Sequence, residues 1–220
     1  MIAALYVERD GPYYGLPRVD PWDEARDARL YAGPHPVVAH PPCQRWGRFW
    51  HGSPRRPHQF QLGADGGCFA AALAAVRRWG GVLEHPADSR AWAFHGLNRP
   101  RRGAGWVPAD MLGGWTCYVE QCHYGHAARK PTWLLAYGCA LPELDWSRGV
   151  QRLDPVVLAR HGYEYARRKG MCSMVGGKDK TKIRNSTPVP FRDMLIAMAE
   201  SAGDGSGHLV PQLVTRTAGA

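Results

Sequence analysis

The chain lacks the features of a membrane or secreted protein. None of its 220 residues falls in an apolar run of the roughly 20 residues that a membrane-spanning helix needs. Its opening, MIAALYVERDGPYY, has no basic segment followed by a long apolar stretch, as a secretory leader would. The six cysteines are neither dense nor regularly spaced, so reduced thiols are expected. These absences favour a soluble protein of the cytoplasm.

Lysine is scarce, whereas arginine is abundant. Only 5 of the 28 Lys and Arg residues are lysine, and the formal net charge is +9. The planar guanidinium of arginine suits two-point contact with phosphate groups and base edges. The composition therefore favours a polyanionic partner, although an arginine-rich solvated surface would have the same composition.

Hydrophobic residues make up 45% of the chain, which is enough for one buried core. Short apolar runs alternate with segments of helical periodicity. Strands are predicted at 2–7, 36–39, 82–83, 115–120 and 132–137, and helices at 20–31, 65–79 and 187–198. We expect the last two strands to form a hairpin at the sheet edge. The alternation predicts an α/β fold with a mostly parallel, doubly wound sheet.

The remaining segments are rich in basic, polar, glycine or proline residues. Residues 44–61 combine arginine, histidine and aromatic residues with internal prolines, which predicts a long functional loop. Residues 139–184 are strongly basic and are expected to form a small insertion within a single domain spanning 1–200. The tail, 201–220, is expected to be disordered.

Two reactive side chains directly follow predicted strands. Cys43 comes after 36–39, and Glu84 comes after Val82-Leu83. Open α/β sheets bind their ligands at these strand ends. A thiolate can add to C6 of cytosine, and a carboxyl group can hold N3, so that C5 attacks a one-carbon donor. Taken singly, each residue also has a structural interpretation, Cys43 as a packed core residue and Glu84 as a surface residue.

Several motifs, in order, resemble those of the cytosine C5 DNA methyltransferases. Residues 41–44, PPCQ, resemble the nucleophile loop, and 82–86, VLEHP, resemble the Glu-Asn-Val motif with its following proline. Residues 113–118 and 124–130, GGWTCY and YGHAARK, resemble a strand and its Tyr-Gly-Val-Pro-Gln-x-Arg-x-Arg segment. Residues 185–190, NSTPVP, resemble the Gly-Asn-Ser-Val-Pro-Pro motif. Each motif is weak alone, and the ordered combination is stronger.

The resemblance implies a Rossmann-like methyltransferase fold and methylation of a cytosine flipped out of DNA, with S-adenosylmethionine as donor. It implies that Cys43 is the nucleophile, that Glu84 holds N3 and that Arg129 clamps the base, with Lys130 as the alternative to Arg129. Other implied substrate contacts are Pro42, Gln44, Arg45, Trp46, His85 and Lys130. The implied cofactor contacts are Gly11, Gly15, Asp20, Asn185 and Ser186.

The chain departs from this family in three respects. The family's Phe-x-Gly-x-Gly-Gly turn is replaced by ERDGPYYGLP, with only Gly11 and Gly15. The family's ribose-binding acid would fall near Arg18, which leaves as substitutes Glu8, Asp10 and Asp20. The large target-recognition domain is also absent, so low sequence selectivity is expected. Two alternatives follow: a related enzyme with another one-carbon donor or a free pyrimidine nucleotide as substrate, and an inactive fold that binds DNA or a protein.

Three further patterns have competing interpretations. Cys117, Cys122, His123 and His126 are residue types that bind zinc, but their spacing matches no zinc motif, and no metal is expected. Residues 46–51, WGRFWH, either stack on an extruded base or fold over the sheet. The basic run 160–182 is a candidate for phosphate contacts. No obligate protein partner is inferred.

Overall fold

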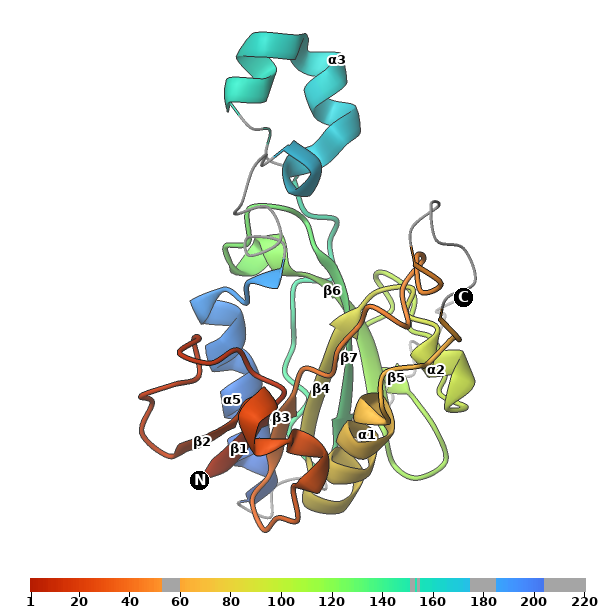
Figure 1. The fold of residues 1–220 in the computed structure, drawn as a ribbon, viewed down its shortest axis with the longest axis vertical. Helices are drawn as coiled ribbons and strands as arrows, with labels where there is room; N and C mark the ends of the chain where they lie inside the picture. The colour runs from red at the N-terminus through yellow and green to blue at the C-terminus, as the bar shows by residue number, and fades with distance from the viewer. Residues whose placement is uncertain (53–59, 151–152, 154, 175–184, 204–220) are drawn as a thin grey trace, which may run out of the picture.

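The computed structural model describes residues 1–52, 60–150, 153, 155–174 and 185–203 (Figure 1). These residues form one seven-stranded sheet with the order β2-β1-β3-β4-β7-β6-β5. The strands are β1 (Ile2–Leu5), β2 (Val19–Trp22), β3 (Val37–Ala39), β4 (Gly81–Pro86), β5 (Val107–Pro108), β6 (Trp115–Glu120) and β7 (Pro131–Tyr137).

The sheet is mixed, with a parallel and an antiparallel half. Strands β2, β1, β3 and β4 are parallel neighbours, whereas β7 is antiparallel to β4, β6 to β7 and β5 to β6. The α/β class is thus confirmed, but the sheet is less parallel than predicted. The hairpin of β6 and β7, joined by a short 3-10 helix, η3 (Gln121–Tyr124), and a turn, was predicted, since a parallel pair needs a crossover of about a dozen residues or more. The antiparallel pairs of β4 with β7 and of β5 with β6 were not predicted.

One long helix covers each face of the sheet (Figure 1). Helix α1 (Cys68–Trp79) packs Phe69, Leu73 and Val76 onto one face, and its first turn is capped by the Asp65 carboxylate, which accepts the Phe69 N–H at 2.9 Å. Helix α5 (Val189–Gly203) packs Phe191, Leu195 and Met198 onto the other face. Both helices and their buried faces were predicted correctly.

The helix predicted over 20–31 is wrong. Residues Val19–Trp22 form β2, an edge strand, where Pro21 is tolerated because one side of the strand needs no N–H donor. The true cap is Asp23, whose Oδ1 accepts the N–H groups of Ala25 and Arg26 and opens a 3-10 helix, η1 (Glu24–Arg26). A second 3-10 helix, η2 (Ala28–Leu30), follows.

Two helices lie in segments expected to be irregular or basic. Helix α2 (Ala91–Phe94) interrupts the loop after β4, and α3 (Pro155–Met174) forms most of the described basic segment and projects away from the sheet in Figure 1. The hairpin of β6 and β7 is not at the edge, because β5 pairs outside β6. Residues 204–220 of the predicted disordered tail lie outside the described residues. In the described part, no helix has both the length and the apolar character to cross a membrane.

Candidate active site

The order of the strands reverses at β1, which has β2 on one side and β3 on the other. In open α/β sheets, ligands bind at such a reversal, outside the carboxyl ends of the strands. The segment after β1 contains Tyr13, and the segment after β3 is His40-Pro41-Pro42-Cys43. The candidate nucleophile therefore follows directly from one of the two strands that define this position.

Glu84 lies on β4, the next strand, and exposes only 8% of its surface. Its Oε2 lies 3.0 Å from Nδ1 of His40, and its Oε1 accepts a hydrogen bond from Nε2 of Gln121 at 3.1 Å. Ala39 of β3 pairs with Leu83 of β4. The next residues along the two chains are His40 and Glu84, so the strand pairing brings their side chains together. The carboxylate is thus held from two sides.

The ionisation of Glu84 follows from these contacts. Burial alone would raise its pKa, but the hydrogen bond with His40 and the positive charge of Lys130 lower the pKa to about 2. Glu84 is consequently a carboxylate at neutral pH, and it accepts hydrogen bonds.

Lys130 connects three of the motifs. Its charge acts on Glu84, and its Nζ donates to the carbonyl oxygens of Ser186 at 2.7 Å and Asn185 at 3.4 Å. The segment before α5 is therefore attached to the segment before β7, beside Glu84. Asn185 and Ser186 contribute backbone carbonyls to this contact.

Arg129, the neighbour of Lys130, has a different partner. Its Nε lies 3.7 Å from Oε2 of Glu120, a fully buried residue that also accepts the Tyr118 hydroxyl at 2.8 Å and the Gly149 N–H at 3.1 Å. Of the two cations that the sequence left open, Lys130 is the one whose charge acts on Glu84.

Cys43 is half-buried at the start of a tight turn. Its carbonyl accepts the N–H groups of Trp46 at 3.0 Å and Gly47 at 3.1 Å, and the Trp46 carbonyl accepts the Arg90 N–H at 2.9 Å. The Gly63 N–H donates to the Arg45 carbonyl at 3.1 Å, which joins the two ends of the segment 45–63. Backbone contacts thus fix the turn that carries the thiol.

Trp46 was predicted to contact the substrate, and its burial contradicts this. The side chain is only 2% exposed and its Nε1 donates to Oδ2 of Asp65 at 2.7 Å. The indole packs on Phe69 of α1 and on Phe94 of α2. It anchors the turn to the core, as in the second interpretation of residues 46–51, whereas Phe49 is 65% exposed.

His85 was also predicted at the substrate, but it points into the other face of the sheet. Its Nδ1 lies 2.7 Å from the Ser89 hydroxyl, and its ring packs against Phe69 and Trp92. Successive residues of a strand face opposite sides, so His85 and Glu84 cannot share one site. Burial lowers the pKa of His85 to about 4, against the charge of Glu84 and the carbonyls of Pro42 and Pro41. Pro42 and Gln44, in contrast, are exposed.

The predicted cofactor region contains a hollow of about 530 Å³. It lies at the carboxyl ends of β1 and β2 and is lined by Val7, Glu8, Arg9, Asp23, Glu24 and Ala25. The predicted Asp20 is not among these residues, because it lies within β2 and binds Trp22 Nε1 at 2.8 Å and Arg26. Gly11 and Gly15 lie in the loop between β1 and β2 and are not among the residues that line the hollow.

The acidic residues that follow β2 are Asp23 and Glu24, which were not among the residues predicted from the sequence. The signal was the proline-containing run VDPW, which was interpreted as a helix start instead of an edge strand. Asp23 is fully engaged, because its Oδ1 caps η1 and its Oδ2 accepts from Tyr14 and Arg9. Glu24 is exposed at the hollow.

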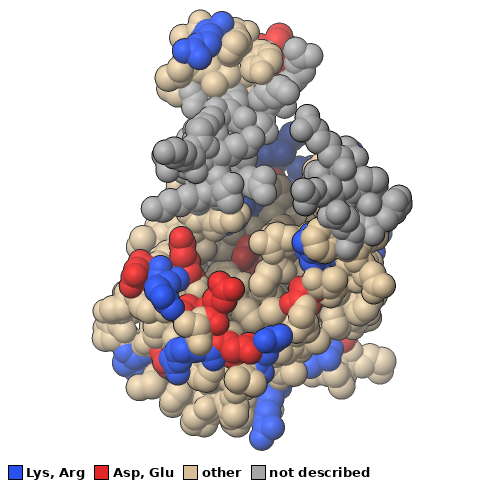
Figure 2. Space-filling model, viewed as in Figure 1, with Lys and Arg blue, Asp and Glu red and all other residues tan. Residues whose placement is uncertain are grey.

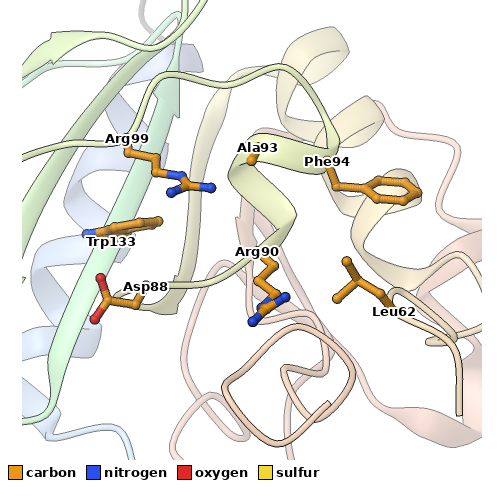
Figure 3. Close-up of a pocket in the computed structure, with 7 residues that line it drawn as sticks. All are labelled: Leu62, Asp88, Arg90, Ala93, Phe94, Arg99 and Trp133. Atoms are coloured by element: carbon orange, nitrogen blue, oxygen red, sulfur yellow. The ribbon is translucent and has the colours of Figure 1, made fainter. Parts of the chain in front are cut away.

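A second hollow, of about 560 Å³, lies between α2 and the start of β7. Figure 3 shows its lining residues: Leu62, Asp88, Arg90, Ala93, Phe94, Arg99 and Trp133. Arg90 and Arg99 are exposed, and the backbone of Arg90 contacts the Cys43 turn through Trp46. This hollow is therefore adjacent to the Cys43 turn on the α1 side of the sheet.

Positive charge does not dominate every surface. Figure 2 shows Asp and Glu interspersed with Lys and Arg over the lower half of the viewed face. Among the described residues, no three His, Cys, Asp or Glu side chains are grouped as a metal site requires.

Comparisons with protein-family models, with curated proteins and with solved structures gave no match for this chain.

Proposed function

We propose that the protein is a DNA cytosine C5 methyltransferase with a Rossmann-like fold. The observation that carries the proposal is the placement of Glu84, a buried and ionised carboxylate, on the strand next to the one that leads to Cys43. The reversal of strand order at β1 supports the fold, and the grouping of Glu84, Lys130 and residues 185–186 supports the family resemblance.

The proposed chemistry assigns a separate task to each side chain. The Cys43 thiolate adds to C6 of an extruded cytosine, which makes C5 nucleophilic. Glu84 accepts hydrogen bonds from the amino group and from N3 of the ring while that ring carries the added electrons. Lys130 is placed to moderate the negative charge of the site. Cys43 leaves again when the C5 proton is lost.

The hollow beside β1 and β2 fits the proposed cofactor. Its volume of about 530 Å³ lies within the roughly 300–1,000 Å³ of small-molecule sites. Exposed Glu24 follows the second strand, where nucleotide-binding α/β folds place a carboxylate that binds ribose hydroxyls. Tyr6 and Asp10 have φ of +59° and +57°, so the loop after β1 turns without the family's glycines. S-adenosylmethionine, when bound there, would supply the methyl group.

Two arginines support DNA as the substrate. Arg90 and Arg99 line the second hollow, next to the nucleophile turn, and a guanidinium suits a phosphate oxygen pair (Figure 3). The net charge of +9 agrees with a polyanion as partner.

A mechanism-based trap tests the proposal. A duplex carrying 5-fluorocytosine cannot lose its C5 substituent as a proton, so an enzyme of this type stays covalently bound after methyl transfer. We expect a stable protein–DNA adduct that requires S-adenosylmethionine and is absent for Cys43→Ala. Unlabelled duplex and dCMP are added as competitors. Adduct formation without S-adenosylmethionine, or competition by dCMP as strong as by duplex, would favour the altered-donor or free-nucleotide enzyme instead. The absence of any adduct would contradict the proposal.

A further inference from the structure

We propose that His40 is a positioning residue that holds the proton taken up by N3 of cytosine. His40 is the middle member of a hydrogen-bonded series that runs from Tyr13 to Glu84. The inference rests on the proposed function, since it concerns the same carboxylate. It adds two residues, Tyr13 and His40, that no motif of the family resemblance includes.

The geometry places one imidazole between two buried oxygen groups. Nε2 of His40 lies 2.8 Å from the Tyr13 hydroxyl, and Nδ1 lies 3.0 Å from Oε2 of Glu84. Tyr13 is 2% exposed and Glu84 8%, and the rings of Tyr13 and His40 pack with centroids 5.4 Å apart. The three residues come from the loop after β1, the end of β3 and β4, so the tertiary fold assembles the series. Both ring nitrogens have a fixed partner.

The carboxylate needs such a partner because it has no proton of its own. With its pKa lowered to about 2, Glu84 is ionised at neutral pH and cannot protonate N3 unaided. An imidazole can carry a proton on each of its two nitrogens and can pass one to a neighbouring carboxylate. A proton on Nδ1 points directly at Oε2, and the His40–Glu84 pair can therefore hold one proton jointly.

The other charged groups around the series do not serve as the donor. Lys130 and His85 act on Glu84, and Arg192 and Asp193 act on Tyr13. Lysine and arginine keep their protons near neutral pH. His85, with a pKa of about 4, has none to give there, and an aspartate accepts instead of donating. Burial raises the pKa of Tyr13 well above its ordinary value, so its hydroxyl also keeps its proton.

One proton moves in this step, from His40 to the cytosine ring. When the Cys43 sulfur forms its bond to C6, an electron pair moves onto N3. The Nδ1–H bond of His40 breaks, the proton passes through the Glu84 carboxylate to N3, and Glu84 is a carboxylate again afterwards. His40 is then neutral, and its Nε2 accepts a hydrogen bond from the Tyr13 hydroxyl. When a water molecule takes the C5 proton, the C5–H electron pair forms the C5–C6 double bond and Cys43 leaves as a thiolate, while N3 returns its proton through Glu84 to His40.

His40→Asn is the decisive variant, because the asparagine amide can still donate a hydrogen bond to Glu84 but cannot titrate. We expect its kcat at neutral pH to fall about 100-fold, a typical contribution of proton transfer. We also expect the alkaline decline of the wild-type pH profile to disappear. If His40 merely supports Glu84, the amide will replace it, and both kcat and the alkaline decline will remain; this result would overturn the inference.

Tyr13→Phe provides an independent measurement if His40→Asn does not fold. Loss of the hydroxyl removes a hydrogen bond to the protonated imidazole, so the alkaline decline should begin at lower pH. An unchanged profile in a folded Tyr13→Phe protein would also overturn the inference. The 5-fluorocytosine adduct of the wild type separates the two proposals, because its absence contradicts the methyltransferase, whereas a wild-type adduct with unaffected variants contradicts only the role of His40.

Discussion

The two faces of β4 differ in what they do with a buried ionisable side chain. On the α5 face, Glu84 is surrounded by polar groups that keep it charged, and its pKa falls to about 2. On the α1 face, His85 lies among aromatic rings that keep it neutral, and its pKa falls to about 4. A buried side chain therefore stays charged where its partners outweigh the cost of burial, as at Glu84, and becomes neutral where burial outweighs them, as at His85. A shifted pKa locates a functional residue only together with its cause.

The difference between the two faces of β4 is tested most directly by removing the ionisable group from each face. We expect Glu84→Gln to lower methyl transfer about 1,000-fold, because the amide cannot pass a proton to N3. His85→Asn should leave turnover close to that of the wild type, because its face is structural. Initial rates with duplex DNA measure both effects. An equal loss in the two variants would mean that the faces are not separate.

Trp46 tests the structural face through packing. Trp46→Ala removes a buried indole and leaves Asp65 without its Nε1 donor, and we expect the free energy of unfolding to fall by about 3–5 kcal/mol. Phe49→Ala is the matched control, since Phe49 is 65% exposed and its loss should change stability by no more than about 0.5 kcal/mol. Urea unfolding measures both. A small effect of Trp46→Ala would place the indole outside the core.

The pH dependence of stability separates the two faces by their titration windows. Both groups have a lower pKa when folded, so the unfolded chain binds more protons and stability decreases as the pH falls. His85 acts from about pH 6.5 down to about 4, and Glu84 from about 4.5 down to about 2. Each contributes on the order of 3 kcal/mol. In His85→Asn, the decline of the free energy of unfolding between pH 6.5 and 4.5 should be smaller than in the wild type, and His95, whose pKa burial also lowers, accounts for part of what remains. An unchanged decline would show that His85 does not cause it.

The smallest effect on DNA binding or stability is expected at the second hollow, on the α1 side of the turn that starts at Cys43. Arg90→Ala and Arg99→Ala should each weaken duplex binding and reduce the salt dependence of log K by about 1. Arg78→Ala, which removes a charge from the far end of α1, serves as the control and should leave the slope unchanged. Titrations at several salt concentrations measure the slope. Equal effects of all three variants would indicate general charge attraction instead of a site.

The elements that could be predicted are those whose signal is local. Helices α1 and α5 follow from apolar spacing and a capping residue, and Glu84 follows from its place after a buried run. Strand β2 was not predicted, because an aspartate followed by a proline is also a common start of a helix. Only the position of these residues at the edge of the sheet distinguishes a strand from a helix here.

The parts of the site that could not be predicted depend on distant contacts. His40 stands directly after a strand, as Cys43 nearly does, but its role appears only from partners 27 and 44 residues away, Tyr13 and Glu84. The partner of Trp46 is 19 residues distant, so an aromatic loop could not be distinguished from an anchored one. Lys130 and Arg129 are adjacent, and which of them acts on Glu84 is set by the turn before β7.

Because the Gly63 N–H donates to the Arg45 carbonyl, the position of the Cys43 thiol does not depend on the number of residues between Arg45 and Gly63. The hydrogen bond between Trp46 and Asp65 lies beside this backbone contact and ties it to the core. Doubling the length of a loop adds only about 0.6 kcal/mol of closure entropy. We therefore expect extra residues inserted between Arg45 and Gly63 to leave the Cys43 turn in place.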